Sequence, residues 1–376
     1  MLDSPLEMRY VEPRLQTKTM ESERVRYCVE RELGFRTYRN AVVFPGVSRK
    51  GYGGVVDSAG LCVPNTSVTA DCAQLGANPD CIPIDSDESV VYLGMMFGCW
   101  GHCITDCLQR FWVFGEGVRG LHPAVRGKKF VYTVTDWRRG LPKSFFDLLD
   151  ILGVNKDLLT LIEQPTRFKE VVIPDSCFYH NLNSGLLEYT KDYASLIGRL
   201  RVPGLVATRK IYFSRRNWAG SQSFGEERFE KMFRTRGYEI VYPELLTFDE
   251  QRRLLAETKE LVSTEGSLAH NAIFMKRGAK VVIIRKARYL NPYQPVVNEI
   301  AGVEPIYIDA NLSHLLFVRT RPWIGPFFLY VNSRLASFLG CRPSFPVFTY
   351  LRYVMFYLCV KGKAFLRKVK ILKTCL

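Results

Sequence analysis

The sequence lacks several signatures by which other classes of nucleotide-dependent enzyme are recognised. No Gly-x-Gly-x-x-Gly follows a predicted strand, which argues against a dinucleotide redox enzyme, and no Gly-x-x-x-x-Gly-Lys-Ser/Thr is present, which excludes a P-loop. No Asp-x-Asp pair ends a predicted strand, because Asp85-Ser-Asp87 precedes the strand near it. We therefore expect no cofactor and no metal site, and we expect a phosphate-bearing ligand to be held by arginine and a helix start.

The sequence also lacks a cysteine framework, a leader and a long apolar run. Eleven cysteines are an odd number without regular spacing, which favours reduced thiols in a cytoplasmic compartment. Residues 1–16 contain no apolar core of a secretory signal. The longest apolar stretch, residues 345–360, is interrupted by Arg352 and is too short to span a bilayer easily. We expect a cytoplasmic protein that lies peripherally on the inner face of the membrane.

Acidic residues are missing from one end of the chain. Residues 310–376 contain no Asp or Glu and carry eleven Lys and Arg, so this segment accounts for +11 of the net charge of +15. Residues 322–376 are also rich in aromatic side chains, and residues 356–376 form a basic amphipathic pattern typical of a helix at a lipid interface. The alternative is a helix that crosses back onto the first domain. A nucleic-acid partner is not expected, since no nucleic-acid-binding motif is present.

Strand and helix patterns alternate in two blocks, which predicts an α/β protein with parallel sheets. The second block is the clearer of the two. Its predicted helices cover residues 225–236, 247–259 and 267–276, and its predicted strands cover residues 210–214, 238–242, 260–264, 280–284 and 304–308.

In the first block we expect helices at 99–114 and 142–152, and strands at 41–44, 89–93, 130–134 and 170–173. The predicted units are two Rossmann-like domains, residues 1–200 and 205–310, and a tail of residues 311–376, with a hinge at residues 201–204. Ligands of open parallel sheets bind at the carboxyl ends of the strands. Two such sheets would therefore face a cleft between the domains.

The first candidate site lies in the predicted helix at 99–114. His102, Asp106 and Arg110 are spaced by four residues, so they would share one face, and a carboxylate one turn from an imidazole can orient it as an acid/base pair. A purely structural pair is the alternative. Three cysteines with the same spacing raise the possibility of zinc, but structural zinc sites seldom use one helix face.

The second candidate site joins a strand to a helix. Gly266 permits a tight turn, and the helix starting at Ser267 could offer backbone N–H groups to a phosphate. Glu265 is suited to a sugar or ribose hydroxyl, and His270 to a diphosphate or a sugar. The alternatives are a helix cap for Glu265 and a core histidine for His270.

The third candidate site surrounds the predicted strand at 210–214. Arginines suit phosphate because their planar guanidinium matches its geometry, and Arg209, Arg215 and Arg216 flank this strand. A solvated basic loop is the alternative.

The ordered set of these motifs resembles glycosyltransferase family 61 over residues 42–308. The motifs are Gly-His-x-x-x-Asp, Lys-Ile-Tyr-Phe-Ser-Arg, Gly-Tyr-Glu-Ile-Val-Tyr-Pro-Glu and Thr-Glu-Gly-Ser-Leu-x-His-Asn. Bacterial members are commonly labelled capsular polysaccharide biosynthesis proteins, and eukaryotic members transfer N-acetylglucosamine or xylose. The resemblance implies a GT-B arrangement, inversion at the anomeric carbon and a UDP-sugar donor. Many members have His-Gly where this chain has Glu265-Gly266, and a small or hydroxyl residue in place of His270.

The resemblance implies roles for individual residues. His102 and Asp106 match the first characteristic pair, Arg215 matches the arginine of Ser-Arg, and Gly266 and Asn271 match the loop that holds donor phosphates. The catalytic candidates are Asp106, His102 and Glu265, and which of them is the base stays open. The donor-binding candidates are Arg209, Ser214, Arg215, Gly266, Ser267, His270 and Asn271.

The predicted function is transfer of a sugar from a nucleotide sugar to a growing cell-surface or capsular glycan, free or lipid-linked. The alternative is a catalytically inert relative that scaffolds polysaccharide assembly at the membrane, since a fold alone does not guarantee activity.

Overall fold

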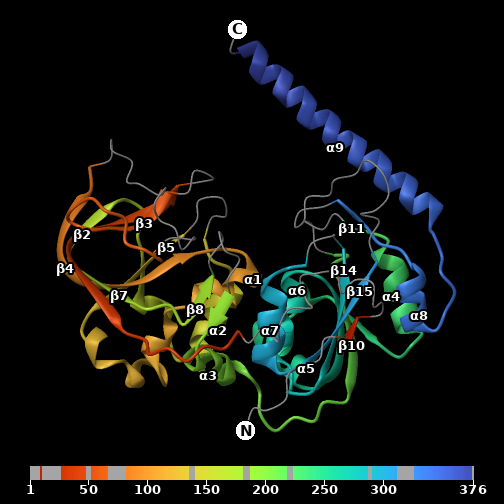
Figure 1. Cartoon of the computed structure of the whole chain (residues 1–376), viewed down its shortest axis with the longest axis horizontal. Helices are drawn as coiled ribbons and strands as arrows, with labels where there is room; N and C mark the ends of the chain where they lie inside the picture. Colours follow the sequence, from red (N-terminus) through yellow and green to blue (C-terminus); the bar gives the residue numbers. More distant parts are fainter. Residues whose placement is uncertain are drawn as a thin grey trace.

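Two six-stranded sheets with flanking helices dominate the computed structural model (Figure 1). The mixed α/β class predicted from the sequence is confirmed. The structure describes residues 9–10, 27–47, 52–66, 82–134, 140–180, 187–217, 223–286, 290–310 and 326–374.

The first sheet is mixed rather than wholly parallel. β2 runs antiparallel to both of its neighbours, whereas β7, β4, β5 and β6 run parallel. The expectation of a purely Rossmann-like first block is therefore wrong at this edge of the sheet. The strand order is β3 (Tyr52–Val56), β2 (Phe35–Val47), β7 (Thr166–Pro174), β4 (Ile84–Met96), β5 (Lys129–Val134) and β6 (Leu159–Leu161).

The second sheet is parallel throughout, as the alternation of strands and helices predicted. Its first strand comes from the start of the chain, so Arg9 and Tyr10 join this sheet and not the first one. The strand order is β1 (Arg9–Tyr10), β15 (Glu304–Asp309), β14 (Lys280–Arg285), β13 (Thr258–Thr264), β10 (Arg209–Phe213) and β12 (Glu239–Val241).

Several helices, among them α2, α3 and α5, have amphipathic patterns with one buried face. The box that caps α5 is present as predicted, with the Thr247 hydroxyl accepting from the backbone N–H of Glu250 and the Glu250 carboxylate accepting from that of Thr247. The helices are α1 (Trp100–Cys103), α2 (Lys143–Ile151), α3 (Lys191–Leu200), α4 (Glu226–Arg234), α5 (Phe248–Ala256), α6 (Ser267–His270), α7 (Tyr293–Ala301), α8 (Ser333–Leu339) and α9 (Val347–Thr374).

Two predicted helices are much shorter than expected. The helix predicted at 99–114 is α1, which ends at Cys103. Two separate 3₁₀ turns follow it, η3 (Asp106–Leu108) and η4 (Phe111–Phe114). The helix at 267–276 ends at His270 and is followed by the 3₁₀ turn η9 (Asn271–Phe274). In both segments buried side chains on several sides, including Ile104 and Ile273, replace the regular period of a surface helix.

One hydrophobic core joins the two halves of the protein, the first half being built around the first sheet and the second half around the second sheet. The same cluster of buried side chains includes Phe111 and Phe145 of the first half and Phe213 and Phe274 of the second. At the junction Trp100 packs against Phe248, with ring centroids 5.3 Å apart. The halves are thus in direct contact around the site described below, whereas the sequence suggested two sheets facing an open cleft.

The predicted hinge at 201–204 is anchored at its first residue. The guanidinium of Arg201 donates to the carbonyl oxygens of Ile273 (3.1 Å) and Ile300 (2.8 Å), both in the second half. These hydrogen bonds fix the start of the linker against η9 and α7.

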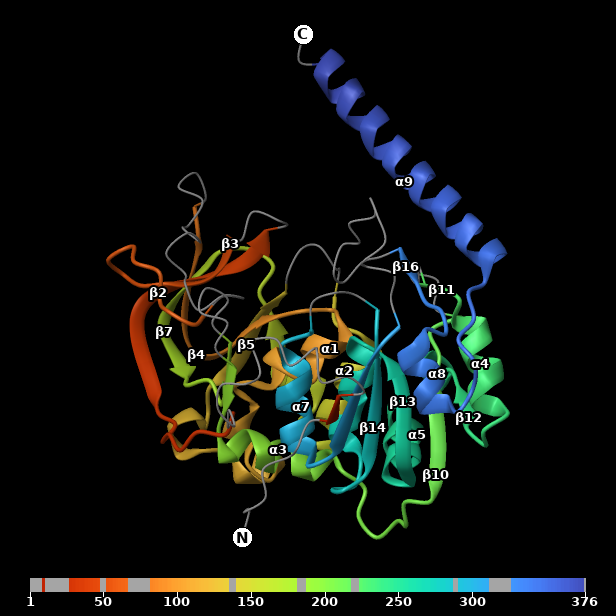
Figure 2. The same cartoon turned by 45° about the vertical axis from the view of Figure 1, so that its right-hand side comes forward.

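The C-terminal segment packs on the second half before it leaves the body of the protein. Leu329, Val331 and Leu335 enter a core cluster with Val282 and Ile308 of the second sheet. α9 then projects away from both halves in Figures 1 and 2, so it does not cross back onto the first domain as one alternative proposed. Among the described residues, no helix is both long and apolar enough to pass through a membrane.

Two small ribbons complete the fold. β8 (Phe178–His180) and β9 (Leu187–Tyr189) pair antiparallel, with β8 against η3, and β11 (Ser223–Phe224) and β16 (Phe327–Phe328) pair in parallel and contact α9.

Candidate active site

His102 and Asp106 form a close pair although the helix predicted to hold them is interrupted. Nδ1 of His102 lies 2.5 Å from Oδ2 of Asp106. The turn between α1 and η3 preserves the one-turn spacing, and the hydroxyl of Thr105 donates to the same carboxylate oxygen at 3.1 Å. The imidazole also stacks on Phe97, with ring centroids 4.6 Å apart. The pair is therefore held in a single orientation.

Asp106 is a fixed anion in this arrangement. Its second oxygen, Oδ1, accepts from the hydroxyl of Tyr293 at 3.1 Å, and that hydroxyl lies 2.6 Å from Nδ1 of His180. Burial raises the pKa of Asp106, but the charge of His102 and its hydrogen bond outweigh this effect, so that the net pKa lies below the usual value. An ionised Asp106 accepts from N–H at Nδ1, which makes Nε2 the basic nitrogen of His102.

Tyr293 brings the second half of the protein into this site. It stands at the first position of α7, and its ring packs edge-on against His102 at 5.6 Å. Burial, followed by the charge of Asp106, raises the pKa of Tyr293, so its hydroxyl stays protonated and can donate. Tyr293 is a site residue that the sequence analysis missed, because it follows a loop with no motif.

Arg110 and the cysteines of the same segment face elsewhere. The fully buried Arg110 donates from Nε to the carbonyl oxygen of Pro174 at 2.9 Å, so it does not share a face with His102. Cys103 and Cys107 are buried and point their sulfur atoms at the Phe97 carbonyl oxygen. Within the part of the chain that the structure describes, no three His, Cys, Asp or Glu side chains gather in a way that could hold a metal ion.

The loop after β13 touches α1 directly. A Cβ atom on Gly101 would lie 2.9 Å from Oγ of Ser267 and 3.1 Å from Nδ1 of His270, so a larger residue there would force a shift. Trp100 donates from Nε1 to Oδ1 of Asn271 at 2.8 Å. These contacts bring the first and second candidate sites together at the junction of the two halves.

Two cations converge on the turn at Gly266. Its φ of +121° is a conformation that residues with a side chain rarely adopt, and a Cβ there would lie 3.7 Å from both Nη1 of Arg215 and Nζ of Lys286. α6 has only four residues, so its dipole is weak and the expected helix contribution to phosphate binding is small. The side chains of Arg215 and Lys286 supply the positive charge instead.

Lys286 was not recognised in the sequence, where it and Arg288 are two basic residues that follow β14. It is 6% exposed, and its ammonium group lies 4.7 Å from the centre of the Phe327 ring. Burial, followed by the charge of Arg215, lowers the pKa of Lys286 to about 7, although Glu226 and Glu265 oppose this shift. A buried amine beside a second cation favours an anionic ligand.

Glu265 is buried next to these cations. Its Oε1 accepts from the backbone N–H of Asn291 at 2.6 Å, while Oε2 has no hydrogen-bond partner. Burial raises the pKa of Glu265 to about 7, and the Asn291 bond and the charges of Arg285 and Lys286 limit the rise. It does not act as a helix cap, since no side chain caps α6.

His270 and Asn271 are buried between the two halves. Neither ring nitrogen of His270 has a partner, and burial lowers the pKa of His270 to about 3, so the ring is neutral. Its ring centroid lies 6.3 Å from that of Tyr293. Nδ2 of Asn271 is also without a partner, while its oxygen binds Trp100.

Unpartnered polar atoms thus gather on one short segment. Buried polar groups in proteins are nearly always hydrogen-bonded, and each exception needs an explanation. Among the described residues, Thr264, Glu265, His270 and Asn271 each carry a buried polar atom with no partner. A ligand rich in hydroxyl and phosphate groups would satisfy such atoms.

The residues of the third candidate site have different partners and do not form one site. Ser214 follows β10, and its hydroxyl donates to Glu230 of α4 at 2.7 Å, so it positions α4. Arg215 reaches the Gly266 turn as described above. Arg216 forms ion pairs with Glu227 and Glu230.

Arg209 does not belong to this site. It begins β10 at the amino end of the sheet, and its guanidinium pairs with Glu239 and Glu257. In a parallel sheet this end lies away from the carboxyl edge that carries Arg215 and Gly266. The expectation that Arg209 binds the donor is therefore corrected by its position.

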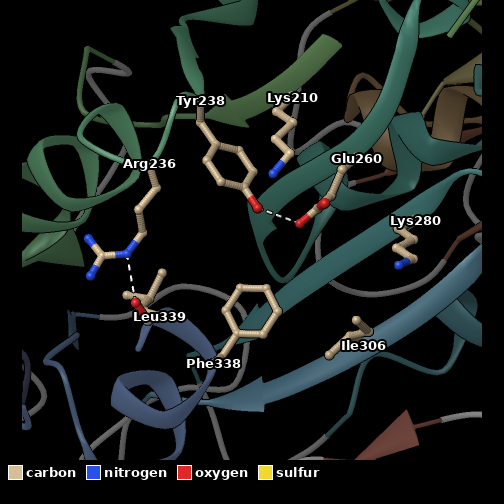
Figure 3. A pocket seen from close by; sticks show the side chains of 8 residues that line it. All are labelled: Lys210, Arg236, Tyr238, Glu260, Lys280, Ile306, Phe338 and Leu339. Atoms are coloured by element: carbon tan, nitrogen blue, oxygen red, sulfur yellow. Dashed lines mark hydrogen bonds between the residues drawn. The ribbon is translucent and has the colours of Figure 1, made fainter. Parts of the chain in front are cut away.

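A separate cavity lies toward the amino end of the second sheet (Figure 3). Its volume is about 340 Å³, and Tyr238 donates to Glu260 across it. The cavity is remote from the His102–Asp106 pair. It is lined by Lys210, Arg236, Tyr238, Glu260, Lys280, Ile306, Phe338 and Leu339.

The His102–Asp106 pair and the cations at the Gly266 turn lie on segments that touch, because Gly101 lies against Ser267 and His270. Residues 100–282 match the model of the family described as Glycosyltransferase 61. The matched segment contains His102, Asp106, Arg215 and the turn at Gly266, and it supports the family resemblance and, with it, glycosyltransferase activity. A search of curated proteins finds no match.

Proposed function

We propose that this protein is an inverting glycosyltransferase that transfers a sugar from a nucleotide-sugar donor, with UDP as the expected nucleotide. The observation that carries the proposal is the meeting of two groups at the junction of the halves. The His102–Asp106 pair comes from the first half, and the Gly266 turn with Arg215 and Lys286 comes from the second. A base and a stabilised leaving group are what inversion at the anomeric carbon requires.

His102 is proposed as the base, and Asp106 as the group that orients it. Both Asp106 oxygens already accept hydrogen bonds, and its lowered pKa makes it a weak proton acceptor. Nε2 of His102 takes the proton of the acceptor hydroxyl as that oxygen attacks the anomeric carbon. The bond between this carbon and the diphosphate oxygen breaks in the same step, and Asp106 stabilises the imidazolium that forms.

Arg215 and Lys286 are proposed to hold the diphosphate, with the backbone of Gly266 and Ser267 beside them. The leaving diphosphate gains negative charge as the glycosidic bond breaks, and fixed cations in a buried site stabilise that charge strongly. Glu265 and Asn271 have unpartnered buried atoms that suit hydroxyl groups of the donor. His270, neutral and buried, suits a contact with the sugar.

The overall arrangement is proposed to be of the GT-B type, with donor binding in the second half and acceptor binding in the first. The residues that we assign to the diphosphate are cations, and the proposed mechanism therefore needs no metal ion. The acceptor is proposed to be a growing cell-surface or capsular glycan, free or lipid-linked.

Thermal shift with nucleotides tests this proposal. A ligand at 100 times its dissociation constant stabilises the folded state by about 2.7 kcal/mol, which raises the unfolding midpoint by a few degrees. We expect UDP or its sugars to stabilise the protein, and free uridine, which lacks the diphosphate, to do so far less. A panel of nucleoside diphosphates without any stabilising member would contradict the donor site.

We expect donor affinity to fall as pH rises through about 7. The protonated amine of Lys286 is the form that binds phosphate, and its pKa of about 7 means that this form is lost above that pH. Glu265, with a pKa of about 7, becomes negative over the same range and also disfavours phosphate. Affinity should decline by up to about tenfold per pH unit for each group.

Isothermal titration of UDP between pH 6 and pH 8.5 measures this dependence. The variant Lys286→Met should weaken binding at pH 6 and flatten the profile, and Glu265→Gln should remove only part of the slope. A profile of the wild-type protein that is flat, or that rises with pH, would rule out these two titrations.

A further inference from the structure

α9 has one end packed on the protein and a long exposed remainder. It spans 28 residues, or about 42 Å at 1.5 Å per residue. Near its start Tyr353 is buried, and its ring packs against Phe224 and Phe328 of the β11–β16 ribbon. Figures 1 and 2 show the rest of the helix extending beyond both halves of the molecule.

The exposed side of this helix carries an apolar stripe. Phe348, Leu351, Met355 and Leu358 are 85%, 51%, 67% and 62% exposed, and their spacing of three, four and three residues places them on one face. Tyr353 is two positions from Leu351, about 200° around the helix, so the stripe lies on the side opposite the packed face. In the sequence the same spacing continues with Phe365, Val369 and Leu372.

The positive charge of α9 indicates which kind of partner would cover the apolar stripe. Residues 310–376 contain no acidic residue, and α9 alone contains seven basic ones: Arg352, Lys361, Lys363, Arg367, Lys368, Lys370 and Lys373. A second copy of this chain would bring like charges together along the stripe, which disfavours a dimer through α9. A nucleic acid would use the charge but leave the apolar side chains in water.

We propose that α9 docks in the interface of an anionic lipid membrane. The apolar stripe enters the boundary between headgroups and acyl chains, while the lysine and arginine side chains reach the lipid phosphates. Each basic residue near an anionic surface strengthens binding by about fivefold, equivalent to about 1 kcal/mol. This proposal stands on α9 alone and does not depend on the transferase activity.

Docking would also bring the candidate active site close to the membrane. Phe328 packs against Tyr353 of α9, and the adjacent Phe327 lies under the ammonium group of Lys286. The packed end of α9 is therefore connected to the proposed phosphate site through two consecutive residues of β16. A lipid-linked acceptor would reach such a site without leaving the membrane surface.

Flotation of the full-length protein with vesicles tests the proposal. We expect binding to vesicles of phosphatidylcholine with about 30% phosphatidylserine, and weak binding to phosphatidylcholine alone. A stripe variant should lose binding, and a matched variant with three exposed apolar residues changed elsewhere should keep it. The stripe variant is Phe348→Ser, Leu351→Ser and Met355→Ser, and the control is Leu61→Ser, Val206→Ser and Leu245→Ser.

A second pair of variants tests whether the positive charge must lie on α9. Both variants lose three positive charges, so their net charges are equal. Removing three basic residues of α9 should weaken vesicle binding by about 100-fold, from about fivefold for each residue. Removing three exposed lysines elsewhere should change it less than about threefold. The α9 variant is Lys361→Gln, Lys363→Gln and Arg367→Gln, and the control is Lys156→Gln, Lys169→Gln and Lys259→Gln.

Circular dichroism and the unfolding midpoint establish that each variant is folded. The proposal is overturned if the wild-type protein stays unbound at every phosphatidylserine content, or if the α9 variants float as well as their controls. It is also overturned if sedimentation velocity without lipid shows a dimer that the stripe variant abolishes, since a second copy would then cover the stripe.

Discussion

Replacement of His102 by glutamine is expected to lower the rate of sugar transfer by about 10²–10⁴-fold while donor affinity changes less than about threefold. Glutamine keeps a hydrogen-bonding group near Asp106 but cannot take a proton from the acceptor hydroxyl. His102 is held by Asp106 at 2.5 Å and stacks on Phe97, so the loss is one of chemistry and not of orientation alone. Single-turnover rates at saturating donor measure it.

Two further variants define the role of the pair. Asp106→Asn should reduce the rate by a similar factor, because the neutral amide cannot stabilise the imidazolium. His122→Gln provides the matched control, since His122 is exposed and lies against Phe35, away from the site. Near-normal turnover of the His102 variant would move the base to Glu265 or Asp106.

Loss of either cation at the Gly266 turn is expected to weaken donor binding by about ten- to a hundredfold. A charge-assisted hydrogen bond to phosphate contributes about 1.5–3 kcal/mol. Arg215→Gln and Lys286→Met remove the charge; glutamine is shorter than arginine, and methionine is close to lysine in size. The effects of the two changes should not be additive, because both side chains lie near the same turn and would contact one diphosphate.

Arg216→Gln is the control for these variants. Arg216 is the next residue along the chain, is exposed and pairs with Glu227 and Glu230 rather than with the turn. Its replacement should leave the dissociation constant of UDP within about twofold, since exposed ion pairs contribute little. Equal weakening by all three variants would indicate a general effect of basic charge and would contradict a specific phosphate site.

The second sheet was predictable because local pattern and tertiary role agree there. Each strand is a short buried run, and each helix has a clear start or stop, as at Thr247 and Gly237. The first sheet was less predictable. β2 (Phe35–Val47) pairs antiparallel with β3 and with β7, and its pairing with β7 joins residues that lie far apart in the sequence.

The His102–Asp106 pair was recognised for a reason that proved only partly correct. The spacing of four residues indicated a helix, and the segment instead ends α1 and turns into η3, where the two side chains still meet. The same spacing suggested Arg110 as a third member, and that prediction was wrong because Arg110 is buried against Pro174. A spacing of four residues correctly predicted that His102 and Asp106 are neighbours. It failed for Arg110, because the helix is interrupted before the second turn.

Lys286 and Tyr293 could not have been selected from the sequence. Each follows a segment without a motif, and each acquires its role from burial next to a residue far away in the chain, Arg215 or Asp106. The lowered pKa of Lys286 likewise results from burial, which a single sequence does not show. Arg209 was selected wrongly for the opposite reason. Arginine is a suitable phosphate ligand, but Arg209 lies at the amino end of its strand, where it pairs with Glu239.

Release of nucleoside diphosphate from a panel of nucleotide sugars is the most direct test of glycosyl transfer. The purified full-length protein should consume at least one donor, faster with a glycan acceptor than with water. His102→Gln should bind that donor normally in thermal shift but release its diphosphate at least about 100-fold more slowly. If the wild-type protein binds donors but consumes none with any acceptor, the protein is an inert relative, and glycosyl transfer by the His102–Asp106 pair is contradicted.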